Sequence, residues 1–266
     1  MKRMSFLPLL LAVSFVFLST TAFAAFQVTG ATLSAAPGTF EGCCPAKIAF
    51  SGRITVNAAG TVRYTFTRSD GATAPEQTLA FTAAGSKDVS TTWTLGGSSL
   101  PTYSGWEAIK IVSPNPMESS KAMFSVTCLS QDPAAVAVKF QVVSRDPKWP
   151  ATQGRIRITG EVKNVGRTPF ESDPRQAMAS LSETSPGARP VTRAQQNFGN
   201  LAPGASIMLT YDRDWNTATE FPPSYILQII YDPDIYLDAN KKNDDCNSKN
   251  NRVELTGAAI NAAWPR

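Results

Sequence analysis

The sequence predicts an all-β protein of two tandem antiparallel β-sandwiches that follow a cleaved signal peptide. Three observations support this prediction. The N-terminus carries a short apolar run, the rest of the chain consists of short segments in which apolar residues alternate, and that alternation is interrupted near the middle. A period of two residues is typical of strands that bury one face. No segment shows a helical period longer than a turn or two.

The N-terminal 24 residues have the parts of a secretory signal. Two basic residues precede an apolar run from Phe6 to Leu18, and small residues follow at Ala22 and Ala24. This order predicts cleavage before Ala25. The alternative, a membrane anchor, fits less well because the run is short and contains a proline. We therefore expect an exported protein, periplasmic or secreted to the cell surface, with no stable membrane span after cleavage.

Composition excludes several function classes. The chain has 25 Lys and Arg against 21 Asp and Glu, so it indicates no basic surface for nucleic acid or membrane. It contains no histidine. That absence excludes Ser-His-Asp and Cys-His catalysis and histidine-ligated zinc or haem.

Residues 25–131 are predicted to form the first sandwich. Short alternating segments separated by turn residues run from Ile48 to Val56, Val62 to Phe66, Leu79 to Phe81, Val89 to Leu95, Ile109 to Ile111 and Phe124 to Cys128. Seven or eight strands within roughly 105 residues suit two packed sheets. We expect Trp93 and Trp106 to fill the core or its rim, with ligand stacking as the alternative.

The four cysteines of an exported chain predict disulfides. Cys44 shares its parity with the apolar residues that follow it, and Cys128 shares its parity with Phe124 and Val126. Both should therefore face the interior, which predicts a buried bridge between the two sheets. Cys43 points the other way, and Cys43 and Cys246 either stay unpaired or join across the domain interface.

The segment from Cys44 to Cys128 resembles an immunoglobulin-like module of exported bacterial proteins. The resemblance is carried by Cys44-Pro45, Thr61-Val62-Arg63-Tyr64, Ser69-Asp70-Gly71, Trp93 and Cys128. It implies an architecture and no particular ligand.

The second sandwich is predicted over residues 134–256, followed by a C-terminal tail at 257–266. Ser130 to Pro133 interrupts the pattern of the first domain. The strongest strand signal of the chain comes next, from Arg155 to Val165. Its apolar residues Ile156, Ile158 and Val162 share one parity, and charged residues occupy the other.

The order of motifs in residues 134–256 resembles the CARDB domain, an immunoglobulin-like module of cell-adhesion-related bacterial proteins. The matching residues are Asn164-Val165-Gly166, Leu201-Ala202-Pro203-Gly204, Asp232 and Asn250-Asn251. The chain departs from the family in a long polar insertion, Thr168 to Thr192, and in Cys246. The resemblance implies binding or spacing next to other surface domains, not chemistry.

These observations favour a non-catalytic binding, adhesion or scaffold protein that contacts a protein or glycan at the cell envelope through its loops. One alternative is a carbohydrate-binding module that stacks sugars on Trp149, Trp215 or Trp106. A second alternative is a glycoside hydrolase that uses paired carboxylates. The acidic residues, however, concentrate in a turn-rich loop.

That loop also raises a calcium hypothesis, and no other cofactor is expected. Asp232, Asp234, Asp238 and Asn240 supply the carboxylate and amide oxygens that calcium prefers. The spacing lacks the glycine and the closing glutamate of an EF-hand. The alternative is an Asx-rich turn whose side chains bond their own backbone.

Overall fold

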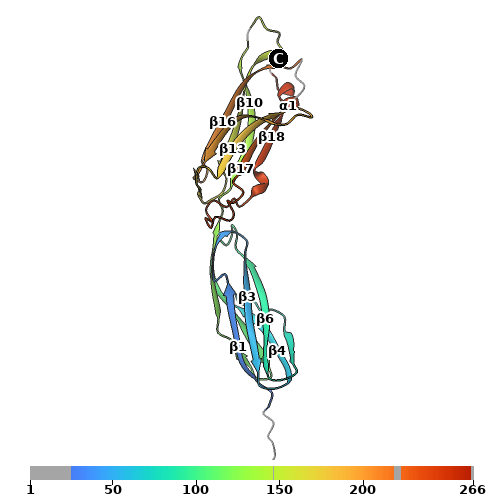
Figure 1. Ribbon diagram of the computed structural model, residues 1–266, viewed down its shortest axis with the longest axis vertical. Coiled ribbons are helices and arrows are strands. Elements are labelled where there is room, and N and C mark those ends of the chain that lie inside the picture. The colour runs from blue at the N-terminus through green and yellow to red at the C-terminus, as the bar shows by residue number, and fades with distance from the viewer. Residues whose placement is uncertain (1–24, 146, 219–222, 265–266) are drawn as a thin grey trace, which may run out of the picture.

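A computed structural model describes residues 25–145, 147–218 and 223–264. Within these residues the regular structure is strand, apart from the 3-10 turn η1 (Ser248–Asn250) and helix α1 (Gly257–Ala262). The strands form two sandwiches arranged end to end along one long axis (Figure 1). This confirms the predicted all-β class. The predicted signal peptide lies outside the described residues, and neither described helix has the length and hydrophobicity of a membrane span.

The first sandwich packs a three-stranded sheet against a larger one. The smaller sheet has the order β1 (Val28–Ala36), β3 (Ala46–Val56), β6 (Gly85–Leu95). The larger has the order β2 (Thr39–Cys43), β9 (Ala122–Leu129), β7 (Thr102–Ser113), β4 (Gly60–Arg68), β5 (Gln77–Phe81), and β8 (Met117–Glu118) pairs with β7. All pairs are antiparallel except β2 with β9.

The second sandwich has a corresponding pair of main sheets. One has the order β10 (Pro133–Ser144), β11 (Gln153–Asn164), β16 (Ser206–Asn216). The other has the order β14 (Val191–Phe198), β13 (Ala177–Thr184), β17 (Ser224–Tyr231), β18 (Arg252–Thr256), and the short strands β12 (Phe170–Glu171) and β15 (Asn200–Leu201) pair separately. Each sandwich has its own hydrophobic core.

Both sandwiches connect their seven main strands in the same way. The first, second and fifth strands form one sheet, and the third, fourth, sixth and seventh form the other. A constant-type immunoglobulin sandwich packs its first, second, fourth and fifth strands against the third, sixth and seventh. Both sandwiches here are immunoglobulin-like with one difference, since the fourth strand lies beside the third. The fold is therefore assigned from topology, and it occurs twice in the chain.

The alternation in β11 places side chains as predicted. Ile156, Ile158 and Val162 are fully buried. On the outer face Arg157 lies opposite Asp212 of β16, and its Nε is 2.7 Å from the carboxylate. Such an exposed cross-strand pair adds little stability. The buried face is what fixes the register of β11, because a slip by one residue would expose it.

The ends of the second domain differ from the predictions. Residues 257–264 do not form a tail, since α1 places Ile260 and Trp264 in the second core. The polar insertion contains the central strand β13 and the first two residues of the edge strand β14. Val136 of β10 is exposed because a bulge between Ala135 and Ala137 shifts its parity.

The first core contains one carboxylate. Glu107 on β7 shares its parity with Ile109 and Ile111, so its side chain points between the sheets. It is 2% exposed, and its Oε2 has no hydrogen-bond partner among the described residues. Burial raises the pKa of Glu107 to about 7, Arg68 opposes this rise, and Asp70 adds to it.

This buried carboxylate predicts a pH dependence of stability. The folded pKa lies above the unfolded value, so folding binds a proton, and stability should fall as the pH rises from about 4.5 to 7. Replacing Glu107 by Gln removes the charge. We expect Glu107→Gln to raise the free energy of unfolding of the first domain at pH 8 by on the order of 3 kcal/mol, with little effect at pH 4.5.

Urea denaturation at both pH values measures the difference. Glu118→Gln on β8 is the matched control, because Glu118 is exposed. Equal effects of Glu107→Gln at pH 4.5 and pH 8 would contradict the prediction.

Candidate functional site

Residues 130–132 form the linker between the two sandwiches, and side-chain hydrogen bonds hold it. Gln131 is fully buried, and its Nε2 donates to the carbonyl oxygens of Lys241 (2.6 Å) and Asp244 (2.7 Å). Its Oε1 accepts from the Thr168 hydroxyl at 3.0 Å. The amide thus joins the linker to two loops of the second domain. One is the loop between β11 and β12, residues 165–169. The other runs from Asp232 to Asn251, is rich in acidic and amide side chains, and is called the β17–β18 loop below.

Asn164, at the end of β11, holds the linker from the other side. Its Oδ1 accepts from the backbone N–H groups of Asp132 (3.1 Å) and Gly166 (3.0 Å), and its Nδ2 donates to the carbonyls of Thr168 (2.9 Å) and Leu201 (2.8 Å). Every donor and acceptor of the buried amide is therefore used.

The turn after Asn164 has room only for a glycine at position 166. A Cβ there would lie 1.7 Å from the Ser130 carbonyl oxygen, a distance that no folded chain tolerates. The backbone of the linker and that of the β11–β12 loop are therefore in direct contact. Arg167 extends this contact to the first domain, where its Nη1 donates to the Ser98 carbonyl at 3.5 Å.

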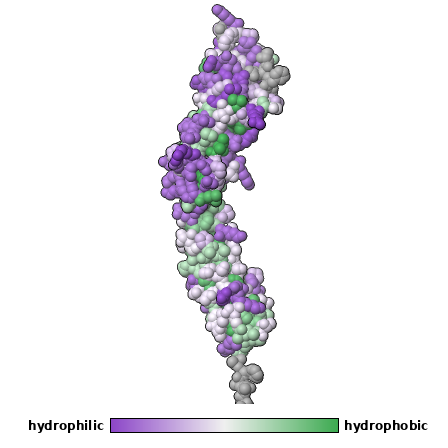
Figure 2. Space-filling view, viewed as in Figure 1, coloured by the Kyte–Doolittle hydropathy of each residue, from purple (hydrophilic) through white to green (hydrophobic). Residues whose placement is uncertain are grey.

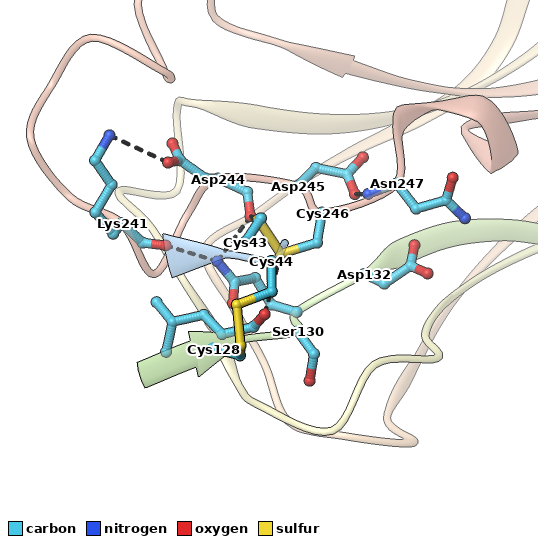
Figure 3. Close-up of a disulfide and its surroundings, with 12 residues drawn as sticks. Cys43, Cys44, Cys128, Ser130, Asp132, Lys241, Asp244, Asp245, Cys246 and Asn247 are labelled. Atoms are coloured by element: carbon cyan, nitrogen blue, oxygen red, sulfur yellow. Dashed lines mark hydrogen bonds and ion pairs between the residues drawn. A yellow bond between two sulfur atoms is a disulfide. The ribbon is translucent and has the colours of Figure 1, made fainter. Parts of the chain in front are cut away.

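Two disulfides lie side by side at the same junction (Figure 3). Cys44 pairs with Cys128 inside the first domain, with a Cα separation of 5.3 Å. Cys43 pairs with Cys246 of the β17–β18 loop, with a Cα separation of 5.2 Å, and so links the two domains covalently. Cys43 and Cys44 are adjacent in the sequence, but Cys43 is bonded to the second domain and Cys44 to the first.

The intradomain bridge differs from its prediction in one respect. Cys44 and Cys128 are half-buried at the end of the first sandwich and are not inside its core. The parity rule places both sulfurs on the inner side, but β9 ends one residue after Cys128, where the sheets no longer cover it. Gly96, at a φ of +94°, leaves room for the two sulfurs, since a Cβ there would lie within 2.7 Å of both.

The proposed calcium ligands do not gather around one point. Among the described residues no three acidic, cysteine or histidine side chains are placed to hold a metal ion. Asp232 and Asp238 instead accept the backbone N–H groups of Asp234 and Asn240, two residues on. Asn240 accepts from Lys242 in the same way. The loop is a series of Asx turns, because each short side chain accepts a hydrogen bond from the backbone N–H two residues on instead of pointing toward a shared ion.

The three candidate stacking tryptophans have different environments. Trp215 is 2% exposed and donates its indole N–H to Asn261 at 2.8 Å, so the prediction of a stacking surface is wrong for this residue. The Trp106 ring is covered by the Lys121 ammonium at 4.1 Å. Trp149 is 42% exposed. It lines a pocket at the end of the second domain far from the junction.

On the face shown in Figure 2 the surface differs between the two domains. In Figure 2 the first sandwich is pale and the second carries most of the strongly hydrophilic side chains, including a group next to the junction where the β17–β18 loop lies. Much of that polarity is used internally, by Lys241 with Asp244 (3.2 Å) and Lys242 with Glu171 (2.9 Å). These ion pairs hold the loop in place within the second domain.

Comparisons with known proteins add little. No known family matches the sequence, and no curated protein matches it. Two solved chains described as a marsupial T cell receptor are similar at TM-scores of 0.25 and 0.23, with 9% and 10% identity. The first match covers 85% of this chain and 100% of the receptor chain, and the second covers 75% and 93%. Scores this low carry no argument, so the immunoglobulin-like assignment rests on strand order.

The hydrogen bonds of Asn164 lead to a prediction about stability. Asn164→Ala leaves two partly buried N–H groups, one partly buried carbonyl and the buried Leu201 carbonyl without their partner. We expect it to destabilise the second domain by roughly 3 kcal/mol, the order expected when buried polar groups lose their bonds. Thermal and urea unfolding measure this. Asn197→Ala on the exposed face of β14 is the control, and equal losses in the two variants would argue against the assigned role of Asn164.

Proposed function

We propose that this chain is an exported, non-catalytic binding protein of the cell envelope, in which two immunoglobulin-like sandwiches form a rigid rod that presents the outer loops of the second domain to a protein or glycan. The observation that carries the proposal is the junction, where a disulfide and a buried amide fix the linker. Domains joined by a simple linker move relative to each other by default. This chain suppresses that motion, which suits a spacer or scaffold.

The cysteine content supports export. Two disulfides are typical of proteins that fold in an oxidising compartment. Several acidic residues of the second domain are held in ion pairs. Glu183, for example, is held between Arg193 (2.8 Å) and Arg213 inside the second domain. A binding role requires no change at Glu183, whereas a carboxylate mechanism at this residue would need its two ion pairs to open.

The rigid-rod proposal predicts different effects for the two disulfides. Replacing both Cys43 and Cys246 by Ser removes the covalent link between the domains, so the distribution of interdomain angles should broaden. Replacing Cys44 and Cys128 should leave those angles unchanged and destabilise the first domain by up to roughly 4 kcal/mol on the chain-entropy estimate for a closed loop of this length. Small-angle X-ray scattering and thermal unfolding of both double variants distinguish these effects. Identical scattering from Cys43→Ser/Cys246→Ser and the wild type would show that the hydrogen bonds alone hold the rod.

Binding to the envelope is tested with the mature protein carrying a fluorescent label. We expect saturable binding to intact cells of the species that carries the gene, and weaker binding after Cys43→Ser/Cys246→Ser because a mobile second domain loses entropy on binding. The Cys44→Ser/Cys128→Ser variant controls for loss of a disulfide as such. Absence of saturable binding by the wild type would reject the envelope partner.

A further inference from the structure

The end of the second domain far from the junction contains a pocket of about 280 Å³. Its base is formed by the start of β11 and the end of β16, where Gln153 pairs with Asn216 and Gly154 with Trp215. Its wall is the β10–β11 loop, which carries Trp149. Typical small-molecule pockets measure roughly 300 to 1,000 Å³, so this one suits a single small ring. The lining residues are Trp149, Gln153, Gly154, Asp214, Trp215 and Asn216.

Trp149 provides an open aromatic surface in this pocket. Trp93, Trp215 and Trp264 are buried, and Trp106 has a lysine over its ring. Trp149 is 42% exposed. A single exposed apolar residue would need no explanation. Here, however, the exposed indole lies beside polar groups that have unused hydrogen-bonding capacity.

Three polar side chains around Trp149 can still bind a ligand. The Gln153 amide makes no hydrogen bond within the part of the chain that the structure describes. Asn216 accepts one bond from the Ala218 N–H at 3.0 Å, which leaves its two donors. The Asp214 carboxylate is 78% exposed and lies 3.8 Å from Arg155, too long for a hydrogen bond. The pocket thus offers two amides and one carboxylate next to a flat apolar ring.

The backbone of the pocket is held in place before any ligand binds. The Thr217 N–H donates to the Thr152 carbonyl at 2.9 Å, and the Gln153 N–H donates to the Pro150 carbonyl at 2.8 Å. From below, the Trp264 indole N–H donates to the Ala151 carbonyl at 3.0 Å. Trp264, just after helix α1, therefore supports the loop, and a ligand would not have to order it.

We propose that this pocket binds one neutral pyranose ring of a glycan, an inference that rests on the proposed binding function. One face of a pyranose presents C–H groups that can pack on an indole, and its hydroxyls each donate and accept, which matches a carboxylate beside two amides. The charges of Asp214 and Arg155 balance, so the pocket favours a neutral ligand over an acidic one. Trp149 is the stacking surface, and Asp214, Gln153 and Asn216 bind the hydroxyls.

The test is isothermal titration calorimetry of the full mature protein with neutral hexose and N-acetylhexosamine oligosaccharides of two to four units, a readout that does not depend on Trp149. At least one should give a saturable heat of binding. Trp149→Ala and Asp214→Ala should each weaken binding by about tenfold or more. Trp106→Ala, the matched control in the first domain, should bind as the wild type does. Trp149 and Asp214 are exposed, so the melting temperatures should stay close to that of the wild type.

Two results would overturn the proposal. One is the absence of a saturable response to every oligosaccharide, and the other is equal binding by Trp149→Ala and the wild type. Binding of a peptide with an aromatic side chain at Trp149, without any sugar response, would also overturn it by assigning the pocket to a protein ligand. The labelled protein would still bind cells in each of these cases if the envelope function holds, so the two proposals fail separately.

Discussion

The relative orientation of the two domains depends on a short linker whose hydrogen bonds go to the second domain. The fully buried amide of Gln131 binds two carbonyls of the β17–β18 loop, and Asn164 accepts the N–H of Asp132, the next residue of the linker. The Cys43 to Cys246 bridge then closes the same contact covalently. A buried amide without partners would cost several times what one hydrogen bond contributes. The linker therefore has one arrangement in which its polar groups are satisfied, and that arrangement fixes the rod.

The β17–β18 loop is best understood through this junction. Its Asp and Asn residues make Asx turns, so a loop of about 20 residues is ordered without strands. The order presents the Lys241 and Asp244 carbonyls to Gln131 and Cys246 to Cys43. Composition alone suggests a metal site for such a loop. The local hydrogen bonds show that the same residue types form a support for the linker.

Sequence patterns predicted the parts of the fold that depend on parity. The alternation in β11 and the inward parity of Cys44 and Cys128 follow from the two-residue period, which is local. The same rule could have identified Trp215 as buried, because it shares its parity with Ile207 and Leu209. Strand β14 could not be found this way. It is an edge strand with exposed polar residues, and its place comes from pairing with β13, a contact set by the rest of the chain.

The pocket at Trp149 was predicted less completely, because its residues come from distant parts of the sequence. Trp149 could be singled out because two prolines make its segment a loop, but its polar neighbours come from β11 and β16, about 60 residues apart, and their support comes from Trp264. A single sequence shows no relation among these positions. Their convergence follows from the strand order, which places the start of the second strand beside the end of the fifth at the far end of the sandwich. The strand order therefore places the loops of the junction at one end of the second sandwich and the pocket at the other. The rigid junction then holds that pocket at a fixed distance from the first domain.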